Sequence, residues 1–341
     1  MLNNTIMKTL KVLLDIYDSI LQSYNDDDCN RKETFFYEYV INKLDYFKRA
    51  VKDIPESEIL QLLDVFVSFD FFKGAKSKMR FNNFINVIVD ECVKILDYYY
   101  KGNICKAKDC LEDLLLSKKK LSRYLGDLYI NSLRCDLMSP VTYYRMRDCK
   151  KDEVPSDCWH VPFESRYLAA SGRFAINGFP CLYLSDSVVT ADKELGDVQE
   201  GKVRWFSEFT FKNPHTVGQK LFLIDLRIPN KDIIESYCLQ ELLDLIITYP
   251  VRLLCCSKAI KYNATAEEYF FPQLLIHLLL TDNKSLQSFK GVVYNSTVNE
   301  GGINYAIPAT YKGLKPIKGH SPFLLSLFET TMPKEYIGKY K

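Results

Sequence analysis

The spacing of apolar residues changes near residue 135, and this change restricts most strongly what the chain can fold into. Before it, apolar residues recur at i, i+3 and i+4, as in Leu10–Leu21 and Phe36–Phe47, which is the pattern of amphipathic helices. After it, glycine and proline become more frequent, and short runs rich in β-branched and aromatic residues appear. The sequence therefore predicts a helical bundle over residues 1–135, followed by a region of mixed helices and strands over residues 136–341.

The same patterns predict individual elements. Further helices are expected over residues 59–71, 84–98 and 110–133, and in the second region over 232–249 and 266–280. Strands are expected at Val141–Met146, Cys181–Leu184, Trp205–Phe211, Leu221–Leu226, Val251–Cys255, Gly291–Tyr294 and Ile303–Ile307. Helices and strands do not alternate strictly, so the second region is predicted to be α+β rather than a doubly wound sheet.

Composition excludes several classes of protein. The chain has 341 residues, of which 47% are hydrophobic, so it can bury the cores of two domains and is neither disordered nor collagenous. Its formal net charge is +2, and neither half is strongly basic, so the charge provides no footprint for nucleic acid.

Cysteine usage and hydropathy predict a cytoplasmic protein. The 11 cysteines contain no Cys-x-x-Cys pair, so reduced thiols are favoured over a zinc site or a disulfide framework. Lys8, Lys11 and Asp15 interrupt the first apolar run, unlike the core of a signal peptide. The longest apolar stretch, near residues 270–280, is too short to span a membrane, so no membrane association is expected.

Common catalytic motifs are absent from the sequence. It contains no phosphate-binding loop, dinucleotide-binding glycine motif, nucleophile elbow or zinc-binding helix motif. All four histidines lie after residue 135, so the helical region lacks the Arg and His pair that some helical ribonucleases use.

Three segments of the second region combine polar and aromatic residues. The first contains Tyr143-Tyr144-Arg145 and, further on, His160-Val161-Pro162-Phe163-Glu164. The second contains Gly172-Arg173-Phe174 and Gly178–Ser185, and leads into Thr190–Glu194. The third contains Tyr269–Gln273, Gly291–Ser296 and Asn304-Tyr305-Ala306.

In this order and spacing the segments resemble the RES family, named for its Arg, Glu and Ser, over about residues 141–308. Members of this family resemble ADP-ribosyltransferases in structure and destroy NAD+, many of them as bacterial toxins or defence effectors. The resemblance implies an ADP-ribosyltransferase-like domain built on two sheets. Position by position, it assigns the three named residues to Arg145, Glu194 and Ser296.

The resemblance also implies a binding set for NAD+. Arg173 and Tyr183 match family positions that line the NAD cleft, and Tyr144 and His160 complete the predicted set. One segment departs from the family, because an aromatic residue often precedes the Glu where this chain has Ala191-Asp192-Lys193.

Physical chemistry supports these assignments. Cleavage of the nicotinamide–ribose bond develops positive charge on the sugar, which a carboxylate such as Glu194 can stabilise. Arginines bind pyrophosphate better than lysines, which suits Arg145 and Arg173. Tyr183 can stack on the nicotinamide ring, and Ser296 can donate a hydrogen bond to phosphate or ribose.

His160 has two interpretations at this stage. It could poise a water molecule or a phosphate for the reaction, or it could be a buried structural histidine behind Pro162. No metal and no bound cofactor are expected, with NAD+ acting as the substrate.

The predicted function is cleavage of NAD+ at the nicotinamide glycosidic bond, with water or phosphate as acceptor. Because such an activity depletes the cell of NAD+, an antitoxin, another inhibitory protein or residues 1–135 are expected to restrain it, and residues 1–135 are also a candidate for homo-oligomerisation. Two alternatives stay open: transfer of ADP-ribose to a macromolecule, and a catalytically inactive NAD-binding module.

Overall fold

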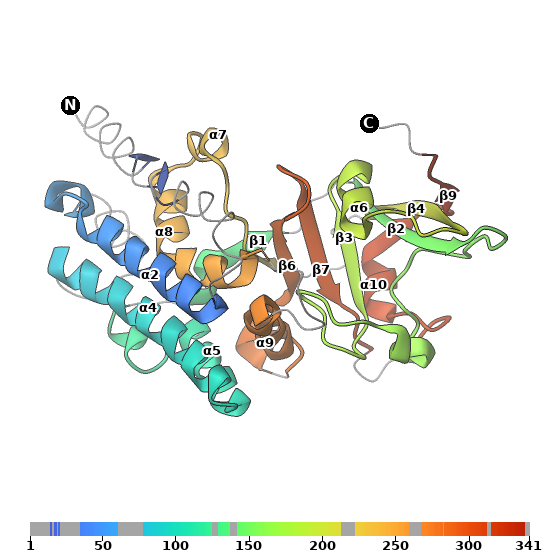
Figure 1. The fold of residues 1–341 in the computed structure, drawn as a ribbon. Helices are drawn as coiled ribbons and strands as arrows, with labels where there is room; N and C mark the ends of the chain where they lie inside the picture. The colour runs from blue at the N-terminus through green and yellow to red at the C-terminus, as the bar shows by residue number, and fades with distance from the viewer. Residues whose placement is uncertain are drawn as a thin grey trace. The chain divides into compact units, whose positions relative to one another are not determined.

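The computed structural model describes residues 14–15, 17–18, 20, 35–60, 78–124, 129–136, 142–212, 222–258, 267–281, 283–311 and 315–337 (Figure 1). The chain divides into two compact units, one of residues 1–133 and 228–271, the other of residues 134–227 and 272–341. The chain first passes between the units near the predicted boundary. It then returns to the first unit over residues 228–271, which differs from the single second domain expected over 136–341. No helix of the described residues is long and apolar enough to cross a membrane.

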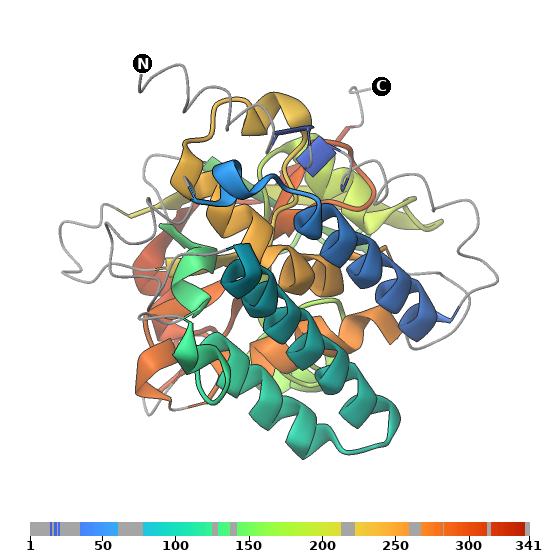
Figure 2. The same ribbon diagram turned by 90° about the vertical axis from the view of Figure 1, so that its left-hand side faces the viewer.

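The first unit is helical. Its elements are α2 (Phe36–Lys52), α4 (Lys78–Tyr100), α5 (Ile104–Leu115), η2 (Leu121–Arg123), η3 (Tyr129–Leu133), α7 (Lys231–Ile234), α8 (Leu239–Cys256), η6 (Glu267–Tyr269) and the start of α9 (Phe270–Leu279). Helix α4 packs against α2, α5 and α8 (Figure 2). The rings of Phe47 and Tyr249 lie 5.1 Å apart, and the Tyr129 hydroxyl donates to the Ile247 carbonyl at 2.7 Å. Residues far apart in the sequence therefore share one helical core.

The expected strand at Val251–Cys255 is wrong, because these residues form the last turns of α8. Pro250 and the apolar run after it suggested a break followed by a buried strand. Proline removes one backbone donor inside the helix, yet the run from Leu242 to Cys256 packs so completely that almost every side chain is buried. A short run of apolar residues that is buried on all sides shows the same sequence pattern whether it is a helix or a strand. Here tertiary packing selects the helix.

The other helical predictions have mixed outcomes. The helix expected at residues 84–98 lies within α4, whereas among the described residues of the one expected at 110–133 only those up to Leu115 are α-helical. Ser117 and Lys119 adopt φ of 50° and 54°, which ends α5 and leads into short 3-10 turns. The helices expected over 10–21 and 59–71 lie largely outside the described residues.

The second unit is built on a mixed sheet. Its strands are β1 (Arg134–Asp136), β2 (Thr142–Lys150), β3 (Cys181–Ser185), β4 (Lys202–Phe211), β5 (Phe222–Asp225), β6 (Phe289–Asn295), β7 (Ile303–Pro308), β8 (Phe328–Thr330) and β9 (Lys334–Glu335). The order is β1-β5-β6-β7-β3-β2-β4-β8, with β9 on β4, and only β5 and β6 pair in parallel. The remaining expected strands are confirmed, and the unit is α+β.

The described strands form one sheet rather than the expected two. Strands β2 and β3 pair only at Tyr144 and Ser185, whereas β2 and β4 pair along their full length. The single residue pair joins what would otherwise be two sheets. The expectation of two sheets is wrong because the pairing of Tyr144 with Ser185 joins β2 to β3, and no local sequence pattern predicts such a single contact.

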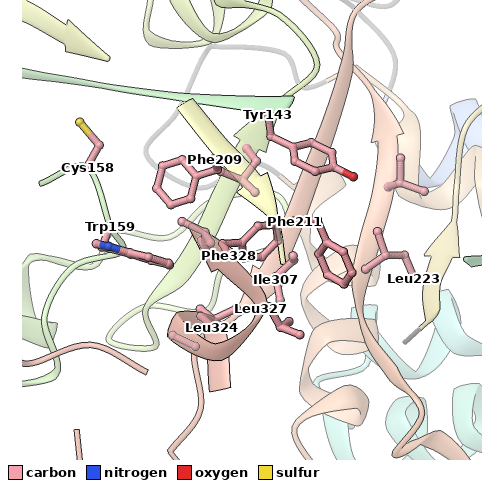
Figure 3. Packing of buried hydrophobic residues seen from close by; sticks show 14 of the residues in the cluster. Tyr143, Cys158, Trp159, Phe209, Phe211, Leu223, Ile307, Leu324, Leu327 and Phe328 are labelled. Atoms are coloured by element: carbon pink, nitrogen blue, oxygen red, sulfur yellow. The ribbon is translucent and has the colours of Figure 1, made fainter. Parts of the chain in front are cut away.

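The two faces of this sheet differ. One face buries an aromatic and aliphatic core between the strands and α10 (Pro322–Leu327), in which Tyr143 and Phe209 pack around Phe328 (Figure 3). Side chains alternate along a strand, so Tyr144 and Ser185, neighbours of core residues Tyr143 and Leu184, belong to the other face. Helix α6 (Val188–Leu195) contacts β2 and β3.

Candidate functional site

The carboxylate of Glu194 is held by two hydrogen bonds from other parts of the second unit. Glu194 lies near the end of α6 and is exposed. The Ser296 hydroxyl and the Asn304 side-chain amide each donate to its Oε1 at 2.6 Å. No donor among the described residues reaches Oε2. The two hydrogen bonds to Oε1 fix the orientation of the carboxylate group, so Oε2 is held in place and is open to a ligand. The structure thus brings together two of the three predicted catalytic residues.

Asn304 connects the carboxylate to the sheet. It lies on β7, only 3% exposed, and is paired in register with Ser185 of β3 and Tyr294 of β6. Its Oδ1 accepts from the Ser185 hydroxyl at 2.7 Å, which leaves its amide group to donate to Glu194. The side-chain hydrogen bond fixes the orientation of the amide, so Glu194 meets a donor rather than an acceptor.

A tight loop after β6 places Ser296 against α6. Its backbone N–H donates to the Gly302 carbonyl at 2.8 Å, and its hydroxyl accepts from the N–H groups of Val298 and Asn299 at 3.2 and 3.0 Å. The hydroxyl therefore directs its proton to Glu194. A Cβ at Gly302 would lie 2.7 Å from Thr190 Oγ1, so glycine permits the close approach of this loop and α6.

A second loop covers the same face of the sheet beside Tyr183. The Phe174 N–H donates to the Tyr183 hydroxyl at 3.1 Å, and the Phe174 ring lies 4.6 Å from that of Tyr294. The amide of Gln273 on α9 donates to the Gly172 carbonyl at 2.9 Å and holds the loop from the other side. Arg173 lies within this loop and is 8% exposed. Tyr183 and Ser185 are two residues apart on β3, so both groups of residues share one face, hereafter the site face.

Arg145 lies on β2, in register with Ser207 of β4. Its neighbour Tyr144 lies opposite Ser185 and so on the site face, whereas Arg145 alternates to the other side. The guanidinium reaches into the region where β2 and β3 diverge, and its Nη1 donates to the Tyr183 carbonyl at 3.0 Å. Its Nε is buried and has no hydrogen-bond partner among the described residues, and burial lowers the pKa of the group. Arg145, the third predicted catalytic residue, is therefore half-buried on the core side of β2, and the structure does not bring it to the site face with Glu194 and Ser296.

The structure does not bring His160 to the site face. The ring is fully buried, its Nδ1 lies 2.7 Å from the Val161 carbonyl, and its Nε2 accepts from the Ser321 N–H at 2.9 Å. This network assigns the neutral tautomer with the proton on Nδ1, and burial lowers the pKa of His160 to about 4. Because both nitrogens are occupied, His160 is withdrawn from the predicted binding set and takes the structural role.

Sequence reasoning missed three residues that the structure places at the site. Asn304, Ser185 and Gln273 all lay inside the segments singled out from the sequence, yet none was assigned a role. Their signal was a polar residue at the end of an apolar strand or inside an apolar helix. What distinguishes these residues from ordinary polar surface positions is hydrogen bonding to distant partners: Ser185 bonds Asn304, 119 residues away, and Gln273 bonds the Gly172 carbonyl, 101 residues away.

No group of three or more His, Cys, Asp or Glu side chains that could hold a metal ion is found among the residues the structure describes.

Part of the chain is similar in sequence to known proteins. The family profile described as "RES domain" matches residues 142–312, which include Arg145, Glu194 and Ser296. Over 216 residues the chain is 25% identical to the protein named "Putative toxin YopC" of Bacillus subtilis (strain 168), a match that covers 57% of this chain. The same match covers 46% of the relative, so the chain spans less than half of that protein's length. No solved structure matches.

The matched region covers half of the chain and carries the hydrogen-bonded Glu194 and Ser296 pair, and the chain belongs to the RES domain family.

Proposed function

We propose that the protein cleaves NAD+ at the nicotinamide–ribose bond, as a toxin or defence effector. The observation that carries the proposal is the exposed Glu194 carboxylate, with one oxygen held by Ser296 and Asn304 and the other open on the site face. An oriented carboxylate at a position that a sugar can reach is what stabilisation of a cationic ribose requires. The name of the relative in Bacillus subtilis supports a toxin role.

The proposed reaction relies on a property of NAD+ itself, because its nicotinamide leaves as a neutral group. The bond between ribose C1′ and the nicotinamide nitrogen breaks, its electron pair stays with the nitrogen, and nicotinamide leaves as a neutral molecule. The positive charge passes to the ribose, where Glu194 Oε2 stabilises it and accepts the hydrogen bond of the 2′-hydroxyl. Water or phosphate then adds to C1′, and a proton from water is released to solvent. Ser296 and Asn304 keep Glu194 oriented throughout.

The remaining predicted residues form the proposed NAD+-binding set. Tyr183 and Tyr144 present aromatic rings on the site face, where one of them can stack on a base of the dinucleotide. Arg173, in the loop on the site face, supplies positive charge for the pyrophosphate. Arg145 lies on the opposite side of β2 and supports the site through its hydrogen bond to the Tyr183 carbonyl, as part of the proposal.

The architecture of the second unit supports the kinship with ADP-ribosyltransferases that the resemblance implies. The unit is α+β, and its strands β2 and β3 pair only at Tyr144 and Ser185, although the described strands form one sheet. We therefore propose an ADP-ribosyltransferase-like fold for the second unit.

We also propose an antitoxin or other inhibitory protein as a partner, because unrestrained NAD+ cleavage would harm the producing cell. The helical region was the other candidate inhibitor, but deleting residues 1–135 is a poor test of it. That deletion would leave α8 without the helices that bury it, since Tyr129 and Phe47 contact α8 directly. Any inhibitory role is better tested with the full chain and point substitutions.

The experiment is proton NMR of NAD+ incubated with the purified full chain, with and without phosphate, beside the variant Glu194→Gln. We expect nicotinamide release by the wild type and not by the variant, and the effect of phosphate identifies the acceptor. Absence of release by the folded wild type would overturn the proposal. Label transferred from NAD+ to a macromolecule would then favour ADP-ribosylation, and stabilisation by NAD+ without release would favour a binding module.

A further inference from the structure

Helix α6, which carries Glu194, is too short to hold itself in place. It spans eight residues, fewer than an isolated helix needs to be stable in water. At its beginning, the Ser187 hydroxyl accepts from the Thr190 N–H at 3.1 Å. At its end, the last carbonyl groups have no partner within the helix and must find one elsewhere. The contacts at this end therefore decide where Glu194 lies.

Arg204 contacts this end of the helix, as do Asn299 through Lys193 and Tyr336 through Asp192. It lies on β4, is 3% exposed, and stands opposite Asp148 of β2 in the sheet register. Its Nε and Nη2 donate to the two carboxylate oxygens of Asp148 at 2.8 and 3.0 Å, a bidentate pair. Its remaining nitrogen, Nη1, donates to the Asp192 backbone carbonyl at 3.1 Å and also to the Asp192 carboxylate. Asp192 lies on α6, two residues before Glu194.

The geometry points to Arg204 and Asp192 as positioning residues for Glu194, an inference that rests on the proposed function. We propose that Asp148 locks the guanidinium onto the sheet and that Nη1, so fixed, holds the end of α6 through Asp192. Arg204 thus links the sheet to the backbone of the helix that carries the carboxylate, beside the contact that Asn304 makes with the carboxylate itself. A misplacement of about 1 Å at a reacting group can cost about 100-fold in rate, so this link controls turnover rather than substrate binding.

The planar guanidinium group explains why position 204 holds an arginine. Three guanidinium nitrogens serve two separate carboxylates and one carbonyl, in a plane that a lysine cannot reproduce with one ammonium group. The two carboxylates raise the pKa of Arg204 above its ordinary value, the Asp148 hydrogen bond contributing most. Truncation of one carboxylate leaves the other to satisfy the cation. The variants at Asp192 therefore test the side-chain part of the link to α6, which the Tyr336 hydroxyl also contacts, while the bond to the Asp192 backbone carbonyl stays.

The test compares Asp192→Ala with Asp192→Asn in the full chain, using NAD+ cleavage as the readout. We expect Asp192→Ala to lower kcat by about tenfold or more with KM within about threefold. Asp192→Asn keeps an oxygen acceptor for Nη1 and is expected to stay within about threefold of the wild type. The control is Asp225→Asn on β5, which takes the charge and one of the two acceptor oxygens from the bidentate pair with Arg227, away from the site face, and should leave kcat unchanged.

A second measurement does not depend on activity. Hydrogen exchange of the α6 amides should be faster in Asp192→Ala than in the wild type and unchanged in Asp225→Asn. Unchanged α6 exchange, or wild-type kcat in Asp192→Ala, would overturn the inference. If the wild type releases no nicotinamide at all, the proposed function fails, and the exchange experiment alone decides whether Arg204 and Asp192 hold α6.

Discussion

The Ser296 hydroxyl donates a hydrogen bond of 2.6 Å to Glu194, although the two residues are 102 positions apart in the chain. The same hydroxyl oxygen accepts hydrogen bonds from two backbone N–H groups of its own loop, so its proton points to Glu194. The contact makes Glu194 and Ser296 a single unit, and the consequences can be measured.

Glu194→Gln should abolish nicotinamide release, with a loss of about 100-fold or more. Glutamine matches the shape of the side chain but carries no charge to stabilise the ribose. The folded state should persist, because the residue is exposed. Glu200→Gln, which changes an exposed carboxylate six residues further on, should cleave NAD+ as the wild type does. Equal loss in both variants would contradict a specific role for Glu194.

Ser296→Ala should lower kcat by about 10-fold to 100-fold, since it removes one of the two donors to Glu194 Oε1. The loop also loses the acceptor for two backbone N–H groups, so a modest fall in the thermal midpoint should accompany the loss. The adjacent Thr297→Ala serves as control for a lost hydroxyl in the same loop. Full activity of Ser296→Ala in steady-state assays would remove Ser296 from the site.

Gly302→Ala should destabilise the second unit by about 1–3 kcal/mol and reduce activity. The new methyl group would lie 2.7 and 2.8 Å from Thr190 Oγ1 and Cγ2, forcing the loop away from α6. Thr190→Ala removes both of those atoms, so the double variant should recover part of the lost stability in a thermal unfolding experiment. Strict additivity of the two substitutions would argue against the steric contact.

His160 should make the protein less stable as the pH falls from about 6.5 to about 4. Burial holds the pKa of His160 at about 4 in the folded protein, below its value of about 6.5 when unfolded, so the unfolded chain takes up the proton first. The stabilisation is fully present above pH 6.5 and is lost toward pH 4, by about 3 kcal/mol at most.

Free energies of unfolding measured by denaturant across this pH range check the prediction. His160→Gln, which does not titrate, should flatten the slope, whereas His277→Gln at an exposed position should not. An NMR titration of the His160 ring in the wild type that gives an ordinary pKa would contradict the expectation without relying on either variant.

Local pattern was sufficient where one conformation buries the apolar residues clearly better. The strands around Tyr143, Tyr183 and Ile303 were predictable because short β-prone runs end in turn residues, and α4 was predictable from its apolar periodicity. The pattern failed at Val251–Cys255, where burial on all sides removes the difference between helix and strand.

The site shows the same division. The residue types and their order along the chain were enough to single out Arg145, Glu194 and Ser296 as candidates, because the order of motifs can be read directly from the sequence. His160 could be assigned to neither role from its surroundings in the sequence, since burial and two hydrogen bonds settle its state.

The amino-acid sequence alone determined the helical and the mixed regions, most strands and the family to which the chain belongs. These follow from the spacing of apolar residues and from short motifs, which are local properties. The orientation of Asn304, the contact between Ser296 and Glu194, and the anchoring of α6 by Arg204 needed the folded chain. Each depends on strand register and on hydrogen bonds across 12 to 119 residues, and no local preference encodes which distant partner a polar side chain will meet.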